Sequence, residues 1–124
     1  MLPRRLAIAL ALALALPLLP GAALAKETRC GWLQNPTPGN LWLDDSQGTW
    51  VLSTQGSDEE ALGMENIGDF STRDFVQTNG YYGYACACMD VETDAAAERI
   101  TAVYAFRQLP LAKCTRDKAL PAPE

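Results

Sequence analysis

The stretch "GYACACMD" (residues 83–90) decides the fold, because two of the four cysteines lie in it with one residue between them. Residues two apart on a strand point the same way with Cα atoms about 6.6 Å apart, the long edge of what a disulfide tolerates. A metal clamp would need four reduced thiolates, usually in C-x₂-C pairs. A redox pair would need a basic neighbour, whereas the nearest charge is Asp90. We therefore expect Cys86 and Cys88 to anchor separate disulfides to Cys30 and Cys114.

The residues around this stretch predict an antiparallel meander from about residue 75 to residue 107. Asn79-Gly80 is typical of a type I′ hairpin turn, which would place Phe75 opposite Tyr84 and Gln77 opposite Tyr82. The next strand pattern, residues 98–108, continues the same face if Cys86 pairs with Tyr104. The expected buried face of the meander then carries Tyr82, Tyr84, Cys86, Cys88, Ile100, Ala102, Tyr104 and Phe106.

Upstream, two short strand patterns, residues 41–44 and 49–54, are separated by a turn at residues 45–48. This hairpin would pair Leu43 with Trp50, Leu41 with Leu52 and Trp42 with Val51, and its core face would carry the leucines and Trp50. Residues 55–71 read mostly as loop, with a short irregular strand around residues 62–67.

The C-terminal stretch "LPLAKCTRDKAL" (residues 109–120) predicts a short helical turn begun by Pro110, which carries Cys114 back over the sheet. Its return near Tyr84 favours the pairs Cys86–Cys114 and Cys30–Cys88, and the sequence leaves the opposite pairing open. The predicted fold class is all-β or β-rich α+β: a small antiparallel sheet or meander of about five strands with a short C-terminal helical turn, stapled by two disulfides.

The first 25 residues have the order of a secretory signal peptide. Arg4 and Arg5 precede an apolar run over residues 6–19, and the small residues Ala23 and Ala25 around Leu24 predict cleavage after Ala25. The run is shorter than the roughly 20 residues that span a bilayer, and Pro17 interrupts it. We expect a periplasmic or secreted protein with no membrane insertion after cleavage, a single domain over residues 26–120 and a flexible tail at 121–124.

The charge balance and the absence of histidine exclude several functions. The chain has 10 basic and 15 acidic residues; removing Arg4 and Arg5 leaves 8 against 15, a formal charge of −7. Such an acidic domain is unsuited to nucleic acid or an anionic membrane and is compatible with a cationic protein partner. With no histidine, Ser-His-Asp and Cys-His nucleophiles and Cys₂His₂ metal sites are impossible. We expect no cofactor.

Four stretches carry a family resemblance: "CGWLQNPTPGN" (30–40), "TWVLSTQG" (49–56), "TNGYYGYACACMDV" (78–91) and "QLPLAKC" (108–114). Together they resemble the domain-of-unknown-function family numbered 4087, a family of small exported bacterial proteins. The resemblance covers Arg29 to about Leu120. It implies an exported single domain with these four cysteines, and it assigns no activity to any residue.

The acidic residues predict neither a metal site nor a catalytic pair. Asp90, Glu92, Asp94 and Glu98 are the best candidates for a hard cation, but an EF-hand-like loop would need glycine at Ala95 and glutamate at Thr101. Asp44 and Asp45 could hydrolyse a glycan only if one acted as the acid and the other as the base. Nothing in their spacing indicates such a pair. We interpret these carboxylates as solvated and expect no enzyme activity.

The aromatic residues give the best binding candidate. Trp32, Trp42 and Trp50 lie near a Pro/Gly loop, and such loops on a rigid sheet often carry binding. We expect Trp50 and Trp32 in the core, while an exposed Trp42 would suit a glycan or a protein partner. The candidate ligand-binding residues are Trp32, Asn35, Pro36, Pro38, Asn40 and Trp42. The expected role is a non-enzymatic binding or inhibitory module of the cell envelope; the alternatives are a passive envelope-structural or stress-related protein and, third, a small hydrolase.

Overall fold

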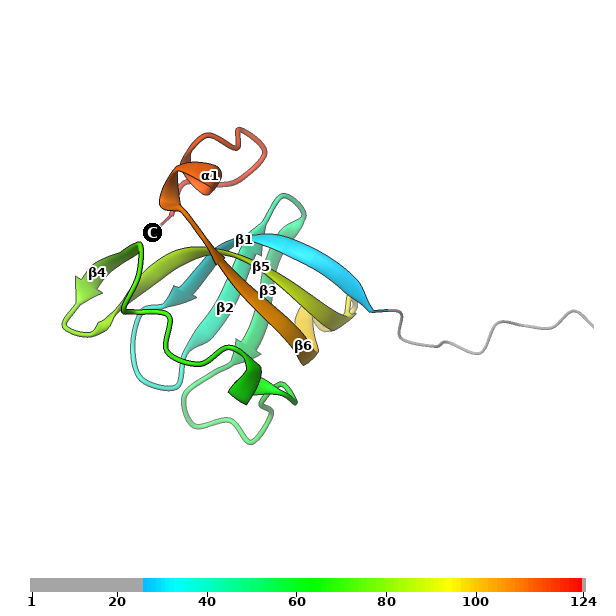
Figure 1. The fold of residues 1–124 in the computed structure, drawn as a ribbon. Helices are drawn as coiled ribbons and strands as arrows, with labels where there is room; N and C mark the ends of the chain where they lie inside the picture. Colours follow the sequence, from blue (N-terminus) through cyan, green and yellow to red (C-terminus); the bar gives the residue numbers. More distant parts are fainter. Residues whose placement is uncertain (1–25, 124) are drawn as a thin grey trace, which may run out of the picture.

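The computed structural model describes residues 26–123, so the predicted signal peptide and the last residue lie outside the described part of the chain. Figure 1 shows the strands curled around a common centre, with the C-terminal helix outside them. In chain order the elements are β1 (Glu27–Asn35), β2 (Leu41–Asp45), β3 (Gly48–Ser53), the 3₁₀ turn η1 (Met64–Asn66), β4 (Phe75–Asn79), β5 (Tyr82–Asp94), β6 (Arg99–Leu109) and α1 (Leu111–Thr115).

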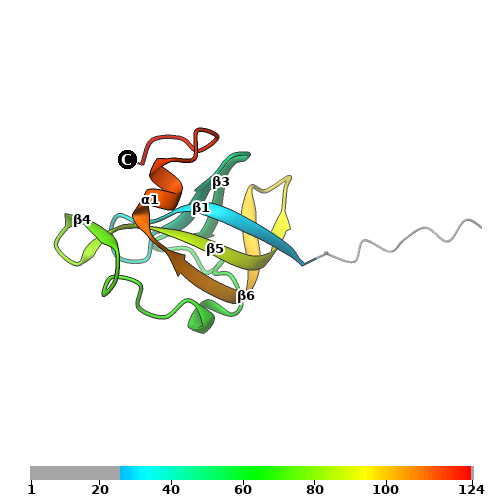
Figure 2. The same cartoon turned by 45° about the horizontal axis from the view of Figure 1, so that its top comes forward.

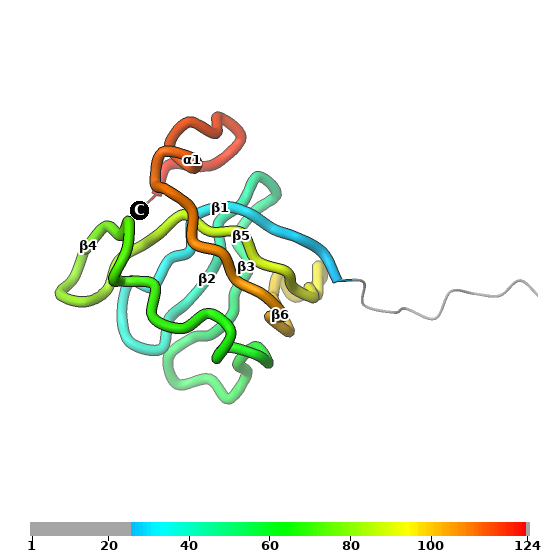
Figure 3. Tube along the Cα trace, viewed as in Figure 1, coloured from blue at the N-terminus to red at the C-terminus, as the bar shows by residue number. Residues whose placement is uncertain are grey.

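The sheet closes on itself into a barrel. The strand order is β1-β2-β3-β6-β5-β4, and β1 also pairs with β5, which joins the two sides of the sheet. The path is visible in Figure 3, where the chain runs through β1, β2 and β3 and returns through β5 and β6. β4 is added to the start of β5 and lies outside the closed ring.

Alternation along β5 fills the barrel. Ala85, Ala87, Met89 and Val91 are at most 1% exposed and point inward, as every second residue of a strand does. Small alanines leave room for branched and long aliphatic side chains from the other strands, which suits a narrow barrel. The fully buried partners are Leu33, Leu43, Leu52, Ile100 and Val103.

The barrel is closed less tightly between β3 and β6. These strands are parallel and pair only at Val51 and Arg99. Beyond that point Leu62 bridges the gap, because its N–H donates to the Thr101 carbonyl and its carbonyl accepts the N–H of Val103. The ring is therefore antiparallel apart from one short parallel closure.

Of the three predicted registers only the first is confirmed, and at two of its three pairs. Leu43 lies opposite Trp50 and Trp42 opposite Val51, although a bulge puts Leu41 opposite Ser53. The register of the second hairpin was wrong by one residue: a bulge between positions 77 and 79 moves the turn to Gly80-Tyr81. The β5–β6 register was also wrong, because Cys86 lies opposite Leu109 and two bulges interrupt the ladder.

The predicted core face of β5 is the outer face of the barrel. Tyr84, Cys86 and Cys88 do share one face, but it points away from the interior, where Ala85 and Ala87 lie. The predicted α1 is confirmed, and it covers this outer face beside β1 and β5 (Figure 2). Both faces of β5 are covered here, so apolar residues occur on both of them. The alternation of side chains along the strand therefore does not indicate which face is the barrel interior.

The segment between β3 and β4 forms no regular strand. The short strand expected around residues 62–67 is reduced to the single bridge at Leu62, followed by η1. Ile67 and Phe70 nevertheless pack into the main core, so the segment covers one end of the barrel.

Candidate functional site

A second, smaller core lies on the outer face of β1 and β5. Trp32 is opposite Cys86, and Gln34 is opposite Tyr84. The Trp32 side chain is only 3% exposed. Its ring meets Tyr84 edge to face, with the centroids 5.3 Å apart and the planes at 82°, a favourable aromatic geometry.

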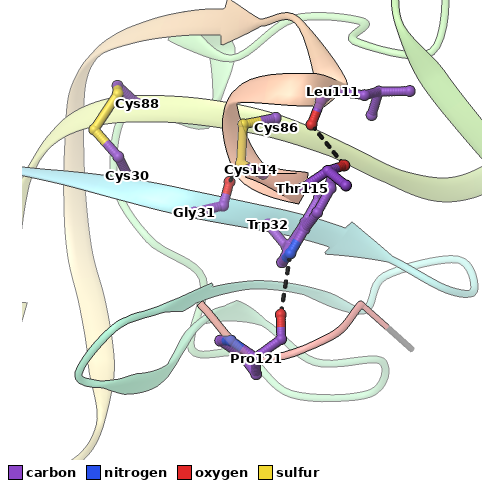
Figure 4. The surroundings of a disulfide bond; sticks show 9 residues. All are labelled: Cys30, Gly31, Trp32, Cys86, Cys88, Leu111, Cys114, Thr115 and Pro121. Carbon is purple, nitrogen blue, oxygen red and sulfur yellow. Dashed lines mark hydrogen bonds between the residues drawn. A yellow bond between two sulfur atoms is a disulfide. The ribbon is translucent and has the colours of Figure 1, made fainter. Parts of the chain in front are cut away.

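The disulfide Cys86–Cys114 fixes α1 over this core (Figure 4). Cys86 is fully buried and Cys114 nearly so. Three leucines pack against the same cluster: Leu109, Leu111 and Leu120. A helix as short as α1 is not stable alone, so the disulfide and this packing hold it in place.

The second disulfide joins Cys30 to Cys88, which face each other directly across β1 and β5 with Cα atoms 4.0 Å apart. Both preferred pairings are therefore confirmed. Two disulfides in so small a domain are typical of proteins of an oxidising compartment.

After α1 the chain folds back onto Trp32. The N–H of Leu120 donates to the Asp117 carbonyl at 3.2 Å and forms a turn. The Trp32 indole Nε1–H then donates to the carbonyl of Pro121 at 3.2 Å, as Figure 4 shows. The packed domain thus extends past the expected boundary at residue 120.

A groove of about 530 Å³ lies between the barrel wall, α1 and this returning segment. We call it the C-terminal groove. Its barrel side is formed by Trp32, Tyr84 and Val76, its helix side by Leu111, Cys114 and Thr115, and its outer side by residues 117–118 and 120–123. The surface is aromatic and aliphatic, with Asp117 and Lys118 as its charged lining residues. Such a concave, mostly apolar surface with a few polar groups suits ligand binding.

Of the six predicted ligand-binding residues, only Trp32 lines this groove. Asn35 and Asn40 hold the loop at 36–40 together instead. The Asn35 amide donates to the carbonyls of Thr37 and Asn40, and the Asn40 side-chain oxygen accepts the N–H of Gln55. Of the two prolines in this loop, Pro36 is half-buried and Pro38 is exposed. The structure therefore gives both asparagines a role in shaping the loop.

Trp42 projects from the outer face of β2 and is half-buried. It lies opposite Gln34 on β1 and Val51 on β3. It shares the outer face with Trp32 but stands outside the C-terminal groove. The predicted binding set is thus split between two places on the barrel surface.

The carboxylates of Asp44 and Asp45 have separate structural partners. The Asp45 carboxylate accepts a 2.7 Å ionic hydrogen bond from Arg29 and a 3.0 Å bond from the Trp50 indole. The Arg29 guanidinium also stacks over the Trp50 ring at 3.7 Å, a cation–π contact. Asp44 is on the other face, where its carboxylate accepts from Thr49. The two acids do not form a pair, and the buried ionic cluster stabilises one end of the barrel.

The acidic residues of the β5–β6 hairpin are bonded singly. Thr28 donates to Asp90 at 2.7 Å. Tyr104 donates its hydroxyl to Glu92, and this hydrogen bond raises the pKa of Tyr104. Across residues 26–123, no group of three or more acidic or cysteine side chains is placed to hold a metal ion.

Sequence reasoning missed Tyr84 and the C-terminal segment as parts of one site. The signal was present in Pro121 and Pro123, because prolines after a cysteine-anchored helix can hold a chain extended along a surface.

None of the helices in the described part of the chain is both long and apolar enough to cross a membrane.

Comparison with known proteins places the chain in a family without assigning an activity. No curated protein matches it. No solved structure matches it either. A family model described as "Protein of unknown function (DUF4087)" matches residues 24–121, nearly all of the domain described above. The chain therefore belongs to this family.

Proposed function

We propose that this protein is a non-enzymatic binding module of the cell envelope and that the C-terminal groove is its ligand site. One observation carries the proposal: a concave aromatic surface is built on the outside of the barrel, between α1, which its own disulfide ties down, and the returning segment. Paired disulfides support an exported location.

The groove is better suited to binding than to catalysis. Thr115 and Tyr84 bring the hydroxyl groups of the lining, and the aliphatic one, on Thr115, donates to the Leu111 carbonyl at 3.0 Å. Its charged lining residues, Asp117 and Lys118, are exposed on the returning segment. Catalysis by a hydroxyl needs a base positioned against it, and no described side chain is bonded to Thr115 in that way.

The charges near the C-terminal groove limit the kind of ligand that it can bind. The domain is acidic as a whole, yet residues 111–123 carry three basic side chains, Lys113, Arg116 and Lys118, against one acid, Asp117. Of these three basic side chains only Lys118 lines the groove, where Asp117 offsets its charge, so an uncharged protein segment or a glycan suits the groove better than a strongly charged ligand.

Affinity capture from an envelope extract tests the proposal. The baits are the oxidised mature protein, Tyr84→Ala, which removes one aromatic wall of the groove, and Tyr81→Ala, the same change at a residue 85% exposed and outside the groove. A Trp42→Ala bait tests the other half of the predicted set. We expect one partner or glycan fraction to be retained by the parent, Tyr81→Ala and Trp42→Ala and lost from Tyr84→Ala.

Two outcomes would reject the groove. Retention by Tyr84→Ala with loss from Trp42→Ala would move the site to the outer face of β2. Identical background on all four baits would favour a passive structural role.

A further inference from the structure

We infer that the C-terminal groove binds an extended, proline-containing segment of another protein, and that the chain's own residues 119–123 occupy part of this site when the partner is absent. This inference rests on the proposed function and names the ligand of the same site. It follows from the sequence of the returning segment, from its contact with Trp32 and from how lightly it is held.

The returning segment has the sequence of a polyproline-type ligand. Residues 119–123 read Ala-Leu-Pro-Ala-Pro. Each proline fixes its own φ near −65° and keeps the preceding residue, Leu120 or Ala122, extended. Such a chain makes no internal backbone hydrogen bonds, so its carbonyls are free to accept bonds from a receptor.

The groove supplies what such a chain needs. Proline-rich segments dock on grooves lined by aromatic rings. Here the rings are Trp32 and Tyr84, set edge to face, and the nearly buried Trp32 indole donates to the Pro121 carbonyl. The contact needs a backbone carbonyl that accepts the indole hydrogen bond and a proline ring that supplies apolar surface beside it. Any extended proline-containing chain offers both groups.

The covering segment is held by few contacts and is therefore displaceable. Pro121 and Ala122 are exposed, while Leu120 and Pro123 are half-buried. The indole bond is the hydrogen bond that joins residues 119–123 to the barrel; the N–H groups of Ala119 and Leu120 bond only to the nearby Asp117, and neither disulfide lies within the segment. The segment forms the outer wall of the groove, so its displacement would open Trp32 and Tyr84 to a longer chain. The groove is lined by one acid, Asp117, and one base, Lys118, which favours uncharged residues next to the prolines of the partner.

A peptide titration tests the inference with the intact, oxidised mature protein. The probe is the synthetic octapeptide DKALPAPE, which copies residues 117–124, and its control is DKALAAAE, in which alanine replaces both prolines. The readout is the Trp32 indole N–H resonance in ¹⁵N-labelled protein, assigned by its loss in Trp32→Phe. The titrated proteins are the parent, Leu120→Ser, which loosens the covering segment, and Leu62→Ser, the same change at a residue 75% exposed and outside the groove.

We expect DKALPAPE to shift the indole resonance saturably in Leu120→Ser and at least tenfold more weakly in the parent and Leu62→Ser. The difference arises because the tethered segment competes at an effective concentration on the order of millimolar. DKALAAAE should bind at least tenfold more weakly than DKALPAPE. Native resonance dispersion in Leu120→Ser shows that the variant is folded; if it is not, Pro121→Ala takes its place.

Three results would overturn the inference. The first is that the proline peptide leaves the indole resonance of the loosened variant unchanged. The second is that both peptides bind equally, and the third is that the parent and the loosened variant bind the proline peptide with the same affinity. A chitohexaose that shifts the resonance where the peptide does not would assign the groove to glycan. Loss of the captured partner from Tyr84→Ala together with a negative peptide titration would leave the proposed function standing and remove only the peptide.

Discussion

Removing the Cys86–Cys114 disulfide should both destabilise the domain and open the C-terminal groove. The bridge closes a sequence separation of 28 residues. The chain-entropy model of disulfide stabilisation gives about 3.6 kcal/mol for a loop of that length at 25 °C. We expect Cys86→Ala/Cys114→Ala to lose up to that amount of unfolding free energy, a large share of the roughly 5–15 kcal/mol of a typical domain.

The structure predicts that part of this loss is local. α1 is five residues long, so without the bridge it is held against Trp32 mainly by the packing of Leu111 and of the flanking Leu109 and Leu120. The other disulfide is the matched control. Cys30–Cys88 spans 58 residues, for which the same model gives about 4.2 kcal/mol, but it joins strands that already pair along the whole of β1. Cys30→Ala/Cys88→Ala should therefore lower global stability and leave Trp32 covered.

Two measurements separate the global and local effects. Guanidinium unfolding followed by far-ultraviolet circular dichroism gives the free energy of each double variant. Hydrogen exchange of the Trp32 indole N–H without denaturant reports whether the groove has opened. We expect exchange to be at least 100-fold faster in the Cys86/Cys114 variant than in the Cys30/Cys88 variant. The reasoning is refuted if the Cys86/Cys114 variant loses less than about 1 kcal/mol or if both variants protect the indole equally.

Three further predictions concern the barrel and its surface. Arg29→Met should cost about 3 kcal/mol of unfolding free energy, which is the low end for breaking a buried ion pair. The cost stays at the low end because the Asp45 carboxylate still accepts hydrogen bonds from three N–H donors. A loss below about 1 kcal/mol in denaturant titration would contradict this. Gly31→Ala should cost about 1–3 kcal/mol, since its Cβ would lie 2.0 Å from a backbone oxygen of β2, and an unchanged unfolding midpoint would show that the strands can move apart. Glu92→Gln should lower the pKa of Tyr104, because the carboxylate stabilises the protonated phenol. This contribution to stability is present below the ordinary tyrosine pKa of about 10 and is lost as pH rises through the raised value, so an NMR titration of the Tyr104 ring that is identical in both proteins would refute it.

The disulfides and the strand content were predictable because they depend on local geometry. Cys86 and Cys88 lie on one strand face and cannot easily bridge each other. Each was therefore predicted to pair with a cysteine distant in the sequence. The β2–β3 hairpin was predictable because its alternation is regular and its turn is short. The ring closure was not predictable, since the long-range β1–β5 pairing and the bridge at Leu62 leave no periodic pattern in the sequence.

The candidate site was only partly predictable because α1 covers the outer face of β5. Tyr84 reads as a core residue when one face of a strand is assumed to be buried. In the structure it lines a groove on the outside of the barrel, together with Trp32. The proline–asparagine loop drew the prediction toward Asn35 and Asn40, whose polar groups bond within the loop and to Gln55.

Site-specific photo-crosslinking in whole cells tests the central claim most directly, because it reports which part of the native protein touches a partner. A p-benzoylphenylalanine is placed at Tyr84, in the groove, and separately at Tyr81, which is exposed outside it. The account predicts a discrete crosslinked protein from Tyr84, attached through a proline-containing peptide, and none of that product from Tyr81. The same product from both positions, or from Tyr81 alone, would contradict the claim that the C-terminal groove is the binding site.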